Sequence, residues 1–83
     1  MNAKRIEELR ELAKKNYADM VPYFDQQIGY AMEEAAEHGL REAEFCVQGK
    51  YTAKGALYRL EELGLSAKIL YWNESWAHIG FKF

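Results

Sequence analysis

The stretch that decides the fold closes the sequence and reads Ala67-Lys68-Ile69-Leu70-Tyr71-Trp72-Asn73-Glu74-Ser75-Trp76-Ala77-His78-Ile79-Gly80-Phe81-Lys82-Phe83. Apolar residues alternate on both sides of a polar segment, which predicts a β-hairpin. We expect residues 73–75 to form a three-residue turn, so that Trp72 lies opposite Trp76. Residues that oppose each other across two strands share a face of the sheet.

This register divides the hairpin into two faces. We expect one face to enter the core and to carry Ala67, Ile69, Tyr71, Ala77, Ile79, Phe81 and Phe83. The other face then carries Lys68, Leu70, Trp72, Trp76, His78 and Lys82. A two-residue turn would place Lys68 beside Phe81 and Ile79, so the three-residue turn is preferred.

Upstream of the hairpin, the spacing of apolar residues predicts three helices and one strand. Residues 2–20 form an amphipathic helix, and Asp19 is expected to cap a second helix that runs to about His38. Gly39 is expected to end that helix. Residues 42–48 alternate as a strand. Thr52 is expected to cap a third helix to Leu63, with Gly64 ending it.

These elements predict a single α+β domain over residues 1–83, with N-terminal helices followed by strand, helix, strand and strand. The apolar alternation of the last strand continues to Phe83, which favours a central place in the sheet. We therefore expect a three-stranded antiparallel sheet of order 1-3-2, with the helices packed on its core face.

Composition excludes several classes of protein. A net charge of −2 argues against binding through bulk charge, and 49% hydrophobic with 29% charged residues indicates a folded chain. The one cysteine, Cys46, fits a reducing compartment, so we expect a cytoplasmic protein. The charged N-terminus is unlike a signal peptide, and no apolar run is long enough to span a membrane.

The candidates for chemistry are weak. Cys46 and His78 are expected on the outer side of the sheet, where a nucleophile would also need an orienting group and an oxyanion pocket. Glu34 and His38 are spaced to share a metal, but they supply only two ligands. We therefore expect no catalytic residue, no metal and no cofactor, and hence no enzyme.

An apolar patch on the predicted outer face is the main candidate for function. It comprises Leu70, Trp72, Trp76 and His78, with Lys68 at its edge. Large exposed apolar patches mark binding sites, and tryptophan is enriched at binding hot spots. Three alternatives stay open: another protein or a second copy covers the patch, a small ligand binds it, or the N-terminal helix covers it. That helix would act through Ile6, Leu9, Ala13 and Tyr17, which also make it a candidate dimerisation arm.

A second candidate surface is basic. Lys50, Lys54 and Arg59 lie on or near one side of the third helix, as in a nucleic-acid face. The run from Tyr58 to Leu65, followed by a hairpin, resembles the recognition helix and wing of winged-helix DNA-binding domains. The chain lacks the additional helix that those domains place before the recognition helix, and Glu74 at the hairpin tip is unfavourable near DNA.

The pattern of helix stops and strands resembles small phage-encoded α+β proteins. It is carried by Ala35-Ala36-Glu37-His38-Gly39-Leu40, Glu44-Phe45-Cys46-Val47, the run from Leu60 to Ile69 and the closing Ile79-Gly80-Phe81, within residues 28–83. Such proteins are often inhibitors or anti-defence factors, including anti-CRISPR-like ones, that act in the host cytoplasm by binding proteins. The leading expectation is therefore a non-enzymatic protein-binding module, with the winged-helix DNA-binding regulator as the alternative.

Overall fold

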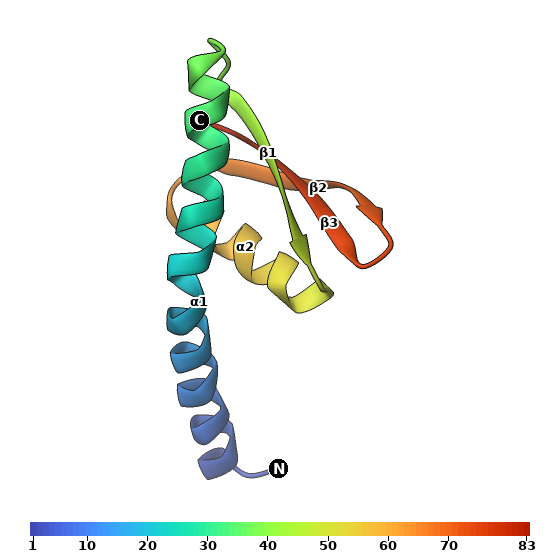
Figure 1. Cartoon of the computed structure of the whole chain (residues 1–83). Helices are drawn as coiled ribbons and strands as arrows, with labels where there is room; N and C mark the ends of the chain where they lie inside the picture. The colour runs from blue at the N-terminus through green and yellow to red at the C-terminus, as the bar shows by residue number, and fades with distance from the viewer.

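The computed structural model describes residues 1–83 as an α+β fold (Figure 1). Its elements are α1 (Ala3–Glu37), β1 (Glu42–Gln48), α2 (Lys50–Glu62), β2 (Ser66–Asn73) and β3 (Trp76–Lys82). The three strands are antiparallel in the order β1-β3-β2. The predicted fold class, strand order and central place of the last strand are confirmed.

The N-terminal region differs from the prediction, because one helix replaces the expected two. Asn2 caps α1 by accepting a hydrogen bond from the Arg5 amide at 2.9 Å. Asp19 and Pro22 both lie inside the helix. Proline removes one backbone hydrogen bond of the helix. The apolar stripe of α1 nevertheless continues past Pro22, because Tyr17 before it packs against the core and Phe24 after it is buried in the core. A break would separate the two parts of that stripe, so packing outweighs the local stop signals.

The two predicted glycine stops are confirmed. Gly39 and Gly64 adopt left-handed backbone angles, with φ of 74° and 76°. The amide of Leu40 then donates to the Ala35 carbonyl, and the amide of Leu65 donates to the Leu60 carbonyl, both at 2.9 Å. The predicted start of the following helix is wrong, because α2 begins at Lys50 after Gly49 and Thr52 lies inside it.

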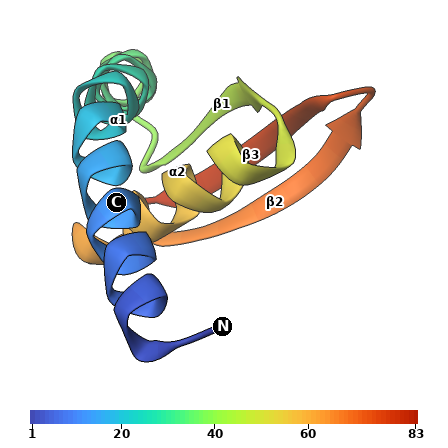
Figure 2. The same ribbon diagram turned by 90° about the horizontal axis from the view of Figure 1, so that it is seen from below.

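Both helices pack on one face of the sheet, where they enclose the core (Figure 2). The buried residues come from α1, β1, α2 and β3, and they are Phe24, Ile28, Ala35, Ala43, Phe45, Val47, Ala53, Ala56, Leu60, Ala77, Ile79 and Phe81. Ala67 and Ile69 of β2 pack against this cluster as expected. Leu63 is exposed, because it follows α2 as its C-terminal cap.

The first half of α1 extends beyond the folded body (Figure 1). No residue before Tyr17 packs against the core, and the molecule measures 52 Å along its longest axis. We call residues 3–16 the N-terminal arm. Neither helix has the length and apolar character needed to cross a bilayer.

Candidate protein-binding surface

The hairpin register differs from the prediction near its tip. Glu74 and Ser75 form a two-residue turn, so Trp76 pairs with Asn73 and Trp72 pairs with Ala77. A β-bulge between Ile69 and Tyr71 then shifts the register by one residue. Below the bulge the predicted pairs are confirmed, including Ile69 with Ile79. The bulge keeps the apolar residues of β2 on the core face despite the shorter turn.

This register places the two tryptophans on opposite faces of the sheet, which corrects the prediction that they share one. Trp72 shares the face of its partner Ala77, which is buried on the helix side. Trp76 precedes Ala77 along the strand and pairs with Gln48 on the opposite face. With Gln48 it also lines a hollow at the strand ends, beside Met20 and Tyr23 of α1 and Thr52 of α2. Tyr71 pairs with His78 and takes the outer-face position that was expected for Trp72.

The outer face of the sheet, which is turned away from both helices, has a packed aromatic centre. The Tyr71 ring stacks on the His78 imidazole with ring centroids 4.1 Å apart. On the other side of His78, the Cys46 sulfur lies 3.1 Å from Nδ1. The Leu70 side chain covers Gly80, because a Cβ built at Gly80 would lie 3.0 Å from its methyl groups. Tyr71 was expected on the core face, because a three-residue turn was preferred. The two-residue turn that the structure shows changes the register and places Tyr71 opposite His78 on the outer face.

The outer face is not covered by the N-terminal helix. In the structure α1 packs against β1 and α2 and does not lie over β2 or β3. Leu70 and Tyr71 on this outer face are 38% and 53% exposed, and Trp72 and Trp76 near the hairpin tip are 45% and 43% exposed. We call these four residues, together with His78, the hairpin surface. They occupy the tip half of one hairpin and present apolar groups on both faces of it.

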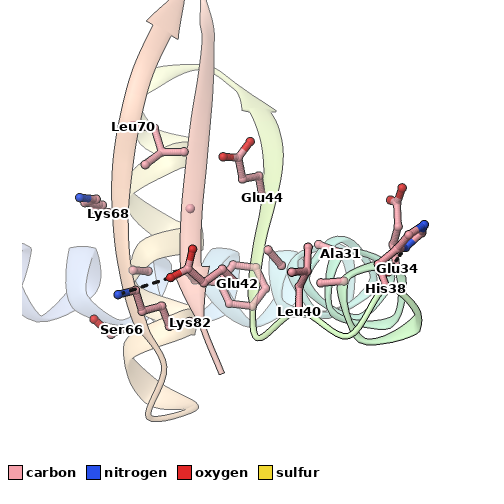
Figure 3. A pocket seen from close by; sticks show the side chains of 15 residues that line it. Ala31, Glu34, His38, Leu40, Glu42, Glu44, Ser66, Lys68, Leu70 and Lys82 are labelled. Carbon is pink, nitrogen blue, oxygen red and sulfur yellow. Dashed lines mark hydrogen bonds and ion pairs between the residues drawn. The ribbon is translucent and has the colours of Figure 1, made fainter.

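A shallow hollow adjoins the hairpin surface (Figure 3). Its volume is about 920 Å³. Lys68 and Leu70 of β2 line one side, and Glu34 and His38 of α1 lie on the far side. Lys82 forms an ion pair with Glu42 at 3.5 Å across its base. The hollow therefore has an apolar floor with charges of both signs around it, as expected for the rim of a protein contact.

Neither of the chemical candidates is assembled into a site. Cys46 and His78 are close together as described, but no third His, Cys, Asp or Glu joins them. His38 contacts the backbone carbonyl of Glu34 at 2.9 Å through Nδ1, so the ring is engaged as a helix cap. A catalytic cysteine–histidine pair needs an orienting group, and a catalytic zinc site needs three protein ligands.

The residues of the predicted basic face are divided between two environments. Lys50 and Lys54 lie over the Tyr51 ring, 5.7 and 5.9 Å from its centroid. Arg59 instead donates two hydrogen bonds to Asp25 of α1, at 2.7 and 3.0 Å. The Asp25 hydrogen bond raises the pKa of the guanidinium. Arg59 therefore ties α2 to α1 and is not directed toward an external ligand.

The predicted arm residues also divide into two groups. Ile6, Leu9 and Ala13 belong to the N-terminal arm, whereas Tyr17 belongs to the contact between α1 and α2. The Tyr17 ring meets the Tyr58 ring edge-on, with centroids 5.2 Å apart, and its hydroxyl donates a hydrogen bond to the Glu62 carboxylate. Burial and that hydrogen bond raise the pKa of Tyr17 to about 12.

Comparison of the chain with protein-family models, with curated proteins and with solved structures found no significant match. The interpretation of the surfaces therefore depends on their own geometry.

Proposed function

We propose that this protein is a non-enzymatic protein-binding module that contacts its partner through the hairpin surface. One observation carries the proposal: four large side chains, Leu70 to Trp72 and Trp76, are exposed together at one end of one hairpin. Monomeric proteins seldom expose such clusters without a function, and tryptophan and tyrosine dominate binding hot spots.

The hairpin is suited to this role because it is held rigid before binding. β3 is paired on both sides, with β1 and with β2, and Gly49 and Gln48 both bond Ser75 near the tip. Tyr71 and His78 are stacked, which limits their rotamers. A preorganised aromatic surface loses little conformational entropy when a partner binds, so more of the contact energy appears as affinity.

The finer proposal is that the module acts as an inhibitor or anti-defence factor of phage type in the host cytoplasm. Its support is the resemblance of residues 28–83 to small phage-encoded α+β proteins. A protein without an assembled catalytic site acts most directly by occupying a surface that its target needs.

The test compares the full chain with the double variant Trp72→Ser/Trp76→Ser, using affinity capture from a host lysate followed by mass spectrometry. We expect the full chain to enrich a specific protein and the double variant to lose it. Neither tryptophan belongs to the buried cluster, so the circular dichroism spectrum and the cooperative unfolding transition should persist.

The matched control is Tyr30→Ser, which replaces one exposed aromatic residue of α1 away from the hairpin. Capture should be unchanged in this variant. Equal loss of capture in both variants would contradict the hairpin surface as the contact. Unfolding of the tryptophan variant would show instead that these residues belong to the core.

The alternative function is DNA binding through α2 and the hairpin. Its support is the cluster of Lys50, Tyr51 and Lys54 at the start of α2, where an exposed ring lies between two cations. The engagement of Arg59 with Asp25 weakens it. This alternative predicts duplex binding that falls steeply with salt and is lost in Lys50→Glu/Lys54→Glu. No mobility shift at low salt would exclude it.

A further inference from the structure

The N-terminal arm exposes an apolar stripe that nothing in the chain covers. Ile6 and Leu12 are 39% and 51% exposed, and no residue of the arm reaches the core. Helical stability in proteins comes mainly from packing of the apolar face, and the arm lacks such packing although it continues the packed half of α1. A second surface that covers the stripe would therefore stabilise the arm.

The stripe has the spacing of a coiled-coil seam. Ile6 and Ala13 fall at a positions and Leu9 at the d position between them, with Asn16 at the next d. The flanking positions are Arg10 at e, and Arg5 and Leu12 at g. Asp19, one heptad beyond Leu12, continues the g flank, and it forms no ion pair within the chain.

The flanking charges distinguish two possible arrangements of a pair of arms. In a parallel pair, each g residue faces the e residue that lies five positions later in the other helix. Arg5 of each copy would then face Arg10 of the other copy, which gives two like-charge contacts. In an antiparallel pair centred near Glu11, each g residue of one helix faces a g residue of the other. Arg5 of each copy then faces Asp19 of the other copy, and the two Leu12 side chains face each other. One like-charge meeting, Arg10 with Arg10, remains near the two-fold axis.

We infer that the arm binds the arm of a second copy of this chain in the antiparallel orientation, centred near Glu11. Leu9 of one copy then packs on Ala13 of the other. A two-fold contact of this kind uses the same surface on both copies. Because the arm extends beyond the folded body of each copy (Figure 1), the two bodies then lie at opposite ends of the pair. Its small area predicts a weak, concentration-dependent dimer.

This contact is separate from the hairpin surface. The free edge of β2 is a less suitable dimer contact, because the bulge beside Leu70 interrupts its hydrogen-bonding groups. The Trp72→Ser/Trp76→Ser variant should therefore leave the dimer unchanged, so that failure of this inference and failure of the proposed function are distinguishable.

The test is sedimentation velocity of the full chain at about 1 to 100 μM and low salt, a range that covers weak dimers. We expect Arg5→Glu and Asp19→Lys each to raise the dimer dissociation constant about tenfold, because each replaces two attractive pairs by two repulsive ones. Mixing the two variants should restore association. In the mixed pair the glutamate introduced at position 5 meets the lysine introduced at position 19, and the unchanged Arg5 meets the unchanged Asp19.

The matched control is Lys4→Glu/Glu11→Lys, which reverses two charges on the helix face opposite the seam and should leave the dissociation constant unchanged. A parallel pair gives the opposite result for Arg5→Glu, because the introduced glutamate would then attract Arg10 and tighten the dimer. That result, a monomer throughout the concentration range, or failure of the mixture to associate would overturn the inference.

Discussion

The two faces of the three-stranded sheet both carry large apolar side chains, yet their surroundings differ. On the helix side, Val47, Ala77 and Ile79 are fully buried under α1 and α2. On the outer side, Leu70 and Tyr71 form part of an exposed surface. Hydrophobic side chains alone therefore do not decide which face becomes the core. The position of the helices decides it, and it leaves the outer face uncovered.

The largest difference between the faces should appear on truncating a core contact. Phe24 of α1 is almost completely buried, so Phe24→Ala should lower the free energy of unfolding by about 3–5 kcal/mol. Urea titration followed by circular dichroism measures this value. Tyr71→Ala on the outer face is the comparison and should cost less than about 1 kcal/mol. Similar losses would mean that the outer face is equally part of the core.

Two glycines allow the same substitution to be made on each face. A Cβ at Gly55 of α2 would lie 2.9 Å from the enclosed Phe24 ring. Overpacking of this kind lowers the free energy of unfolding by about 1–3 kcal/mol. The higher helix propensity of alanine raises it by about 1 kcal/mol. We expect a net loss of about 1 kcal/mol for Gly55→Ala.

Gly80→Ala is the matched substitution on the outer face. Its Cβ would lie 3.0 Å from Leu70, but that side chain is partly exposed and free to rotate outward. The change in unfolding free energy should stay within about 0.5 kcal/mol of zero. A larger loss at Gly80 than at Gly55 would contradict the assignment of the two faces.

A smaller effect on the helix side depends on pH. Tyr17 has its pKa raised from 10.0 to about 12 by burial and by its hydrogen bond to Glu62. Between these values the unfolded chain loses the proton first, so the stability that this group contributes falls as pH rises from about 10 to 12. Tyr17→Phe should lower the free energy of unfolding by about 1 kcal/mol at neutral pH. The variant should also lack the part of the alkaline loss of stability that comes from Tyr17.

Urea titrations of both proteins across the alkaline range provide the measurement. The difference in stability between the wild type and Tyr17→Phe should narrow as pH rises. Tyr58→Phe is the control, because its hydroxyl forms no hydrogen bond within the chain. A constant difference at all pH values would mean that the Tyr17 proton is not held by the fold.

The sequence predicts most of the fold because the decisive signals are local. Gly39 and Gly64 end their helices as expected, and the alternation of residues 42–48 and 77–83 indicates two strands. The continuity of α1 was missed, because Asp19 and Pro22 are local stop signals, whereas the stripe that overrides them gains its energy from distant packing on α2 and β1.

The candidate site was predicted less well, for a related reason. The alternation of apolar residues specifies that Ile69 and Ile79 share the core face. Two hairpin geometries meet this condition: a three-residue turn, or a two-residue turn combined with a β-bulge. The positions between the turn and the bulge are therefore undetermined by pattern alone, and these are the positions of Tyr71 and Trp72. The exposure of a face also depends on where a helix docks, which no local pattern specifies.

The smallest expected effect tests what determines that register. Glu74 adopts a left-handed conformation with φ of 56°, which costs a non-glycine residue about 1–2 kcal/mol. Glycine removes this strain but loses about 0.5–1 kcal/mol through its more flexible unfolded state. Glu74→Gly should therefore stabilise the protein by about 0.5 kcal/mol, as measured by urea titration.

The register should not change in this variant, because the pairing of Ile69 with Ile79 fixes the strands below the bulge. Nuclear Overhauser contacts between the Tyr71 and His78 rings report it directly. If those contacts vanish and Trp72 moves opposite Trp76, the strained turn maintains the bulge, and both tryptophans then lie on the outer face. If they persist, the core pairs maintain the register, and the hairpin keeps apolar groups on both faces.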